Sequence, residues 1–279
     1  MEKKKLLWEK YKWYLLIKVP ILIYLAISLS IVPTINAVPQ EVIQGAHRGN
    51  SIDFEENTLD AFKSALESDK YTFIEFDVQY SKDNKIVVFH QNDQYHIPKQ
   101  WVEISELNYN ELQSYFKFKI PQYHEVMDLV NNQKPLDIEI KSHGDFEKDK
   151  QLVDFVIADC ENRNCDKIIL TSPSEEVIEY IEEKYPKINT RRVFWIHPFS
   201  ILPLETTTTW FYESTQADYM IMHGYNIKNY NLLLKCKPKD KGIMFWYYTD
   251  EIYIAENPEN CGSFWIEQTP QVSIDLEQA

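Results

Sequence analysis

The sequence contains little glycine, six residues among 279, and no stretch rich in glycine or proline that would link separate domains. It also lacks internal repeats and low-complexity tracts, which excludes a repeat solenoid and a disordered chain. The hydrophobic content of 44% and the aromatic content of 14% instead favour a packed core. We therefore expect one large domain, residues 38–279, after an N-terminal segment, residues 1–37.

Basic residues are in deficit, with 29 lysines and arginines against 43 aspartates and glutamates, and the net charge is -14. Several lysines precede residue 38, so the rest of the chain is more acidic still. An acidic surface repels polyanions, which argues against nonspecific binding of nucleic acid. It suits a site in which carboxylates surround a divalent cation.

No uncharged run near the N-terminus reaches the ~20 residues that span a bilayer. The apolar run Val19–Val32 has 14 residues and follows the basic start Lys3–Lys5. One interpretation is a signal peptide cleaved after Ala37, and the other is an uncleaved anchor over residues 13–33 in which Lys18 snorkels. Both predict an exported protein that is secreted, periplasmic or held at the cell surface.

The four cysteines are Cys160, Cys165, Cys236 and Cys261, and no two of them have the spacing of a zinc site. Their number fits an oxidising compartment. We expect Cys160 to pair with Cys165 and Cys236 with Cys261, and the alternative is four buried thiols.

Short apolar runs alternate with amphipathic stretches through the rest of the chain. This alternation predicts an α/β fold, a (β/α)8 TIM barrel, and a doubly wound open sheet is the alternative. The expected strands are 42–47, 72–78, 86–90, 136–141, 167–171, 191–197, 218–223 and 241–246, followed by a helix-like piece and residues 263–267.

Charged side chains gather where these strands end, which is where a barrel places its active site. Glu75 and Asp77 share one face of their strand because strand side chains alternate, and so do Asp137, Glu139 and Lys141. Inward-facing carboxylates are costly unless a cation neutralises them. We expect Glu75, Asp77 and Glu139 to bind Mg²⁺ or Ca²⁺, and a structural ion pair is the alternative.

Two histidines, His47 and His90, end two other expected strands and suit general acid–base chemistry. Arg48 and Lys141 add fixed positive charge near the expected cation. This combination suits a phosphate group, whose oxygens gain charge in the transition state. The residues therefore indicate metal-assisted cleavage of a phosphoester.

These motifs together resemble the glycerophosphodiester phosphodiesterase family, over about residues 42–270. The resemblance rests on His47-Arg48-Gly49, on Glu56-Asn57-Thr58, on Glu75-Phe76-Asp77, on a strand ending in His90 and on the Leu136–Lys141 strand LDIEIK. Gly242–Thr249 is similar to the family's eighth strand.

The resemblance implies a TIM barrel that uses a divalent metal to hydrolyse glycerophosphodiesters to an alcohol and glycerol 3-phosphate. By matching position, His47 and His90 are the acid–base pair, and Arg48 and Lys141 contact the phosphate. Glu75, Asp77 and Glu139 are the metal ligands. The implied partner is a small glycerophosphodiester or a lipid head group.

The chain departs from the family pattern at three places. Gln91 follows the second histidine where the family has aspartate, and Glu55 replaces a proline. Glu267–Pro270 stands where the family has Thr-Asp-x-Pro. No expected ligand or catalytic histidine is lost, so the departures bear on substrate preference and rate.

Other polar and aromatic residues near strand ends are candidates for the substrate rim. His143, His197 and His223 can line its mouth, and Trp246 and Trp195 can stack on a head group, with core packing as the alternative.

Two other functions remain: a related phospholipase C or D acting on lipids, and a catalytically silent surface binding protein. No apolar loop that would dock on a membrane is evident after Lys141.

Overall fold

A closed barrel of eight strands is the centre of the part of the chain that the computed structural model describes, residues 11–12, 18–22, 42–90, 93–94, 102–165, 167–194 and 205–259. Its strands are β1 (Ile43–Ala46), β2 (Phe73–Tyr80), β6 (Leu136–Ile140), β7 (Ile168–Ser172), β8 (Asn189–Phe194), β9 (Tyr219–His223), β10 (Gly242–Trp246) and β11 (Glu251–Glu256). The barrel closes because β1 pairs with β2 on one side and with β11 on the other. The predicted barrel is thereby confirmed.

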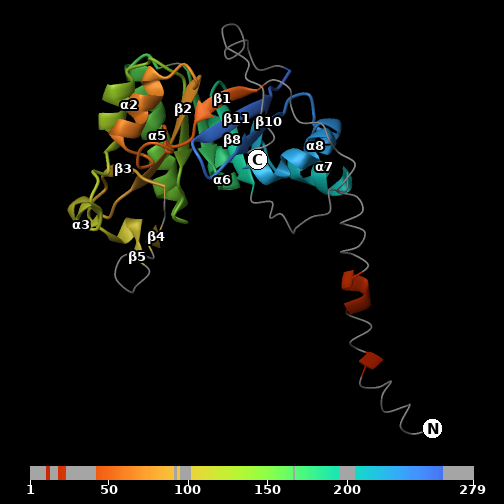
Figure 1. The fold of residues 1–279 in the computed structure, drawn as a ribbon. Helices are drawn as coiled ribbons and strands as arrows, with labels where there is room; N and C mark the ends of the chain where they lie inside the picture. The colour runs from red at the N-terminus through yellow and green to blue at the C-terminus, as the bar shows by residue number, and fades with distance from the viewer. Residues whose placement is uncertain are drawn as a thin grey trace.

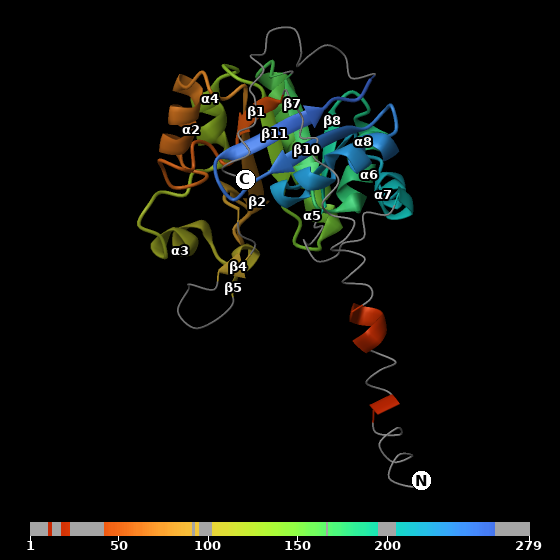
Figure 2. The same ribbon diagram turned by 45° about the vertical axis from the view of Figure 1, so that its right-hand side comes forward.

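Helices follow most of the strands and cover the outside of the barrel, with α2 and α4 on one side and α7 and α8 on the other (Figures 1 and 2). They are α2 (Leu59–Glu67), α4 (Tyr123–Val130), α5 (Phe146–Asn162), α6 (Glu175–Lys184), α7 (Glu205–Glu213) and α8 (Tyr230–Cys236). Thr58 caps the N-terminus of α2, and its hydroxyl accepts a hydrogen bond from the Ala61 amide at 3.3 Å. Asp145 caps α5 in the same way through the Lys148 amide.

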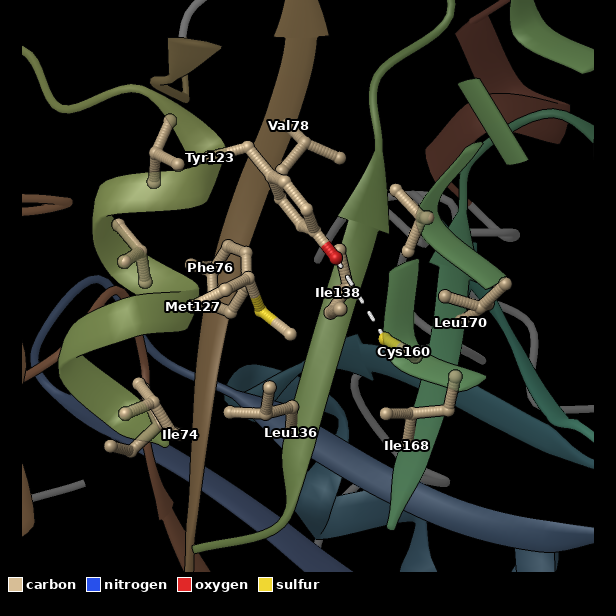
Figure 3. Close-up of a cluster of buried hydrophobic side chains, with 14 of the residues drawn as sticks. Ile74, Phe76, Val78, Tyr123, Met127, Leu136, Ile138, Cys160, Ile168 and Leu170 are labelled. Carbon is tan, nitrogen blue, oxygen red and sulfur yellow. Dashed lines mark hydrogen bonds between the residues drawn. The ribbon is translucent and has the colours of Figure 1, made fainter. Parts of the chain in front are cut away.

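The alternation of side chains along β2 and β6 separates the hydrophobic core from the polar site. Ile74, Phe76 and Val78 point outward, where they pack with Tyr123 and Met127 of α4 (Figure 3). The intervening residues Phe73, Glu75 and Asp77 face the barrel interior. Phe73 belongs to an apolar cluster that also contains Ile43, Ile169, Tyr219, Ile221, Met244, Trp246, Ile252 and Ile254.

Residues 86–90 do not form a barrel strand, so that prediction is wrong. The strand is β3 (Ile86–Val88), which runs antiparallel to residues 78–80 at the end of β2. A tight turn with Asn84 at φ 55° joins the two strands, and a parallel pair needs a long crossover instead. His90 consequently follows a hairpin strand rather than a barrel strand.

A small excursion connects β3 to α4 and lies apart from the helices that surround the barrel (Figures 1 and 2). It consists of β4 (Asp93–Gln94), β5 (Val102–Glu103), η2 (Ile104–Glu106) and α3 (Tyr109–Ser114).

The last barrel strand, β11, also differs from the prediction of a helix-like piece after residue 246. It pairs antiparallel with both β10 and β1, because the short connection Tyr247–Asp250 allows only a hairpin. The segment similar to the family's eighth strand, Gly242–Thr249, therefore contributes the seventh strand of the barrel, β10. Residues 263–267 lie outside the described part of the chain.

The predicted disulfide between Cys160 and Cys165 is wrong, since the structure has both residues as thiols. The Cys165 amide donates to the Cys160 carbonyl at 2.8 Å, and the Cys160 sulfur lies 3.8 Å from the Tyr123 hydroxyl (Figure 3). A hydrogen bond with Cys165, together with burial, raises the pKa of the Cys160 thiol. Cys261, the expected partner of Cys236, is outside the described residues.

Most of the N-terminal segment, residues 1–37, lies outside the described residues as well. Its described pieces, 11–12 and 18–22, are helical. Among the described residues, no helix combines the length and apolar character that crossing a membrane requires.

Candidate active site

A cavity of about 360 Å³ opens where β1, β2 and β6 end. The predicted site residues that line it are His47, Arg48, Glu75, His90, Glu139, Lys141 and Trp246. Asp77, which shares a face of β2 with Glu75, is in contact with Lys141 of this lining. Residues from widely separated parts of the sequence, from His47 to Trp246, thus converge on one site.

The turn after β1 brings the first motif against the carboxylates. Arg48 has φ 60° and Gly49 has φ 79°, and this left-handed turn directs the Arg48 amide to the Glu75 carboxylate at 2.8 Å. A Cβ atom at Gly49 would lie 2.8 Å from the carbonyl carbon of Ala61 in α2. Glycine is therefore required here by both the backbone conformation and the close approach of the helix.

His47 is a buried, neutral imidazole with one nitrogen directed to the carboxylates. Its Nδ1 lies 3.2 Å from the Thr249 carbonyl oxygen, which can only accept, so Nδ1 carries the proton. Its Nε2 lies 3.9 Å from Glu75. Burial, reinforced by the Arg48 charge, holds the pKa of His47 well below its ordinary value. His47 can therefore accept a proton through Nε2.

His90 is also neutral but more exposed. Burial, with the charges of Lys141 and Arg48 adding to it against the opposing Asp77, lowers the pKa of His90 to about 3. Its Nδ1 is 3.9 Å from a Glu56 oxygen, and the other oxygen of Glu56 accepts a hydrogen bond from Arg48 at 2.8 Å. Glu56 thus connects the second histidine to the arginine of the first motif.

The three predicted ligands Glu75, Asp77 and Glu139 each offer an oxygen within 4.8 Å of the others. Burial and the neighbouring carboxylates Asp77, Asp137 and Glu139 raise the pKa of Glu75 well above its ordinary value. Asp77 behaves oppositely: despite its burial, Lys141, His90 and Arg48 lower its pKa. The buried Asp77 Oδ1 atom lies 3.1 Å from the Lys141 ammonium. Three hard oxygen donors at this separation fit Mg²⁺ or Ca²⁺.

The two predicted phosphate contacts pair with these carboxylates. Lys141 Nζ lies 2.7 Å from Glu139 and 3.1 Å from Asp77. Arg48 Nε lies 3.6 Å from Asp77. Asp77 and Glu139 raise the pKa of Lys141 against the effect of burial, so the lysine stays charged. Both cations therefore stand beside the cluster where an anion would enter.

Several residues that support the site were not predicted. Asn57 is buried and donates to Asp77 at 2.9 Å, and its place in the Glu-Asn-Thr motif was the available signal. Asp137 was recognised as inward-facing, but its partner Arg191 on β8 was not. Nothing local in the sequence indicated that pair, since β6 and β8 are separated by β7.

The remaining rim candidates have different outcomes. Trp246 lines the cavity, with its ring centroid 5.7 Å from that of His47. His143 does not line it, and its Nε2 instead contacts Gln79 Oε1 at 2.9 Å. His197 and Trp195 lie outside the described residues.

Comparison with known proteins identifies similar chains. Residues 47–226 match the Glycerophosphoryl diester phosphodiesterase family. A glycerophosphodiester phosphodiesterase from Thermotoga maritima is similar, at 24% identity and TM-score 0.54, covering 74% of this chain and 84% of that one. No curated protein matches the sequence.

Two further solved structures share the fold. A candidate glycerophosphoryl diester phosphodiesterase from Silicibacter pomeroyi has 16% identity and TM-score 0.59, covering 75% of this chain and 87% of that one. A phosphodiesterase from Oleispira antarctica, in complex with the product sn-glycerol-3-phosphate, has 18% identity and TM-score 0.55, covering 73% and 83%.

Proposed function

This chain belongs to the glycerophosphoryl diester phosphodiesterase family, and we propose that it hydrolyses glycerophosphodiesters to an alcohol and glycerol 3-phosphate with a divalent cation and two histidines. The observation that carries the proposal is the convergence, around one cavity, of three clustered carboxylates, two cationic side chains and two neutral histidines. A silent binding protein would not need the acid–base pair.

The cation would be held by Glu75, Asp77 and Glu139. The closeness of their carboxylate oxygens, all within 4.8 Å of one another, supports this assignment. When bound, the cation withdraws charge from the phosphoryl oxygens and offsets the repulsion between the carboxylates and the anionic substrate.

Arg48 and Lys141 would hold the phosphate from the other side. Charge-assisted hydrogen bonds from these side chains strengthen as negative charge grows on the phosphoryl oxygens. Burial of the site increases this effect because water screens the charges less. The Asn57 and Glu56 contacts keep Asp77 and Arg48 in position for it.

The histidines would move the protons. Because its Nδ1 proton faces Thr249, His47 has Nε2 available to take the proton of the attacking oxygen, from water or from the neighbouring glycerol hydroxyl. Attack by the hydroxyl would give a cyclic phosphate, which a water molecule would then open to glycerol 3-phosphate. His90 would give a proton to the departing alcohol as its bond to phosphorus breaks. The anionic substrate raises the proton affinity of His90, which counters the depressed pKa of the free site.

The test is release of glycerol 3-phosphate from glycerophosphocholine by the full chain, with and without EDTA and with Mg²⁺ or Ca²⁺ restored. We expect chelation to abolish activity and one of the ions to restore it. Full activity in EDTA would overturn the metal assignment. Inactivity on every glycerophosphodiester, with cleavage of sphingomyelin instead, would overturn the substrate class.

Variants test the histidine roles separately. His47→Ala and His90→Ala should each lower kcat by about 10²-fold or more. His124→Ala is the matched control, because His124 is exposed on α4 and does not line the cavity. Near-normal rates for either site variant would remove that residue from the mechanism.

One observation favours the lipid alternative as a second candidate. Ile52 and Phe54 are 62% and 42% exposed in the loop before α2. Phe54 lines, with Arg48 and His90, a second cleft of about 430 Å³ beside the site. An exposed apolar loop there would contact an acyl chain. Cleavage of lysophosphatidylcholine at a higher kcat/KM than glycerophosphocholine, lost in Phe54→Ser, would support this candidate, and equal or lower kcat/KM would refute it.

A further inference from the structure

Three aromatic rings stand together beside the cavity, and two of them, Trp246 and Tyr248, line it. We call His223 of β9, Trp246 of β10 and Tyr248 of the turn after β10 the aromatic cluster. The His223 ring centroid is 4.7 Å from Trp246 and 4.6 Å from Tyr248, and Trp246 is 5.2 Å from Tyr248. Two of these contacts are edge-to-face, a favourable arrangement for aromatic pairs that holds the rings at defined angles.

The aromatic cluster lies where one of the two alcohol groups of a bound phosphodiester would reach it. The carboxylates belong to β2 and β6, and Lys141 directly follows β6, on one side of His47. Trp246 and Tyr248 belong to β10 and the turn after it, on the other side of His47, and both line the cavity. A phosphate bound between the carboxylates and the histidines therefore has room to direct one of its two alcohol groups to the rings.

Tyr248 is not held in place as a core residue. It is 75% exposed, and Tyr225 of η3 (Gly224–Asn229), whose ring centroid is 4.5 Å from that of His223, is 57% exposed. Large aromatic rings that remain this accessible beside a cavity offer their faces to a ligand. Trp246, in contrast, is buried, which holds its ring in one position within the aromatic cluster.

The charge around the aromatic cluster suits a cation. The His223 Nδ1 atom accepts a hydrogen bond from the Tyr225 amide at 3.2 Å, so its ring is neutral there, and burial lowers its pKa further. Arg48 and Lys141 are paired with carboxylates on the other side of His47. The net charge of -14 adds a general attraction for cations.

We propose that the aromatic cluster is a subsite for a quaternary ammonium group carried by the alcohol half of the substrate. The cation would lie against the faces of Tyr248 and Trp246, where the ring electrons attract it. This inference rests on the proposed function, which supplies the phosphodiester. It adds a preference for choline-like head groups over neutral ones of the same shape.

The experiment compares two substrates of equal size with the full chain. One is glycerophosphocholine, and the other is its uncharged isostere with 3,3-dimethylbutanol in place of choline. The wild-type ratio of kcat/KM should favour the cation by about 3- to 30-fold. Tyr248→Leu should reduce this ratio toward one, whereas Tyr248→Phe, which retains the ring, should preserve it.

The matched control is Tyr115→Leu, because Tyr115 is an exposed tyrosine at the end of α3 and does not line the cavity. Its ratio should equal that of the wild type. A wild-type ratio near one, or an unchanged ratio in Tyr248→Leu, would overturn the subsite.

Binding of choline, measured by saturation-transfer NMR, separates this inference from the proposed function. Choline binding that is lost in Tyr248→Leu supports the subsite, even when no glycerophosphodiester is hydrolysed and the proposed function therefore fails. Absence of choline binding to the wild type, with both esters hydrolysed equally, overturns the subsite alone.

Discussion

Replacing Arg191 with methionine should destabilise the barrel in a way that depends on pH. Arg191 and Asp137 form an ion pair inside the barrel, and neither side chain is exposed. Asp137 also accepts a hydrogen bond from the Thr171 hydroxyl at 2.5 Å. Removing the guanidinium leaves a buried carboxylate near Glu75 and Glu139, which increases the repulsion among them.

The magnitude follows from the environment of the pair. Breaking a buried ion pair by removing one partner costs about 3–5 kcal/mol. Burial, although opposed by Arg191, already raises the pKa of Asp137 to about 6. Protonation of Asp137 in the variant therefore limits the loss of folding stability. Protonating the carboxylate costs about 1.4 kcal/mol for each pH unit above that pKa. We expect a loss of about 3 kcal/mol at pH 8 and about 1 kcal/mol at pH 5.

The sign follows from linkage. A carboxyl group whose folded pKa is raised binds more protons in the folded state than in the unfolded state. Its contribution to the free energy of unfolding therefore falls as pH rises from about 4 to 6. Without Arg191 the folded pKa of Asp137 rises further, so the decline continues above pH 6.

Urea unfolding in EDTA at pH 5 and pH 8 measures this effect, and Arg191→Met/Asp137→Leu completes the cycle. The double variant should recover most of the stability at pH 8, because no uncompensated charge remains. Arg163→Met is the control, because Arg163 pairs with Asp128 and Asp159 at the surface. This variant should lower the free energy of unfolding by less than about 1 kcal/mol. Equal losses at both pH values for Arg191→Met, or no recovery in the double variant, would refute the reasoning.

Three further predictions concern the site and the N-terminus. Gly49→Ala should lower the free energy of unfolding by about 1–3 kcal/mol, because φ is 79° and the new Cβ meets Ala61; a thermal melt that matches the wild type would contradict this. Asn57→Ala should weaken Mg²⁺ or Ca²⁺ binding about 10- to 100-fold by freeing Asp77, as calorimetry can measure, with Asn132→Ala as an exposed control. If the N-terminal segment is a signal peptide, Edman sequencing of the secreted protein should begin at Val38, and an intact initiator methionine would support the anchor instead.

The chemistry of the site was accessible from the sequence because its information is local. Strand alternation alone places Glu75 beside Asp77 and Glu139 beside Lys141, and the structure brings both pairs to one cavity. The His-Arg-Gly motif likewise specifies its own turn, since glycine is what the left-handed backbone after His47 requires. The barrel itself followed from the repeated alternation of strands and helices.

The pairings between distant elements depended on the tertiary structure. An apolar run reads the same in a parallel strand and in an antiparallel one, so β3 was predicted as a barrel strand. The segment of β11 was predicted as helix-like, and its pairing with β10 and β1 makes it a strand. The Arg191–Asp137 pair and the aromatic cluster join strands through the barrel interior or across its rim. Closure of the sheet into a barrel determines which residues of these strands meet. Closure depends on pairing between strands that are distant in the sequence, so no local sequence pattern predicts these contacts.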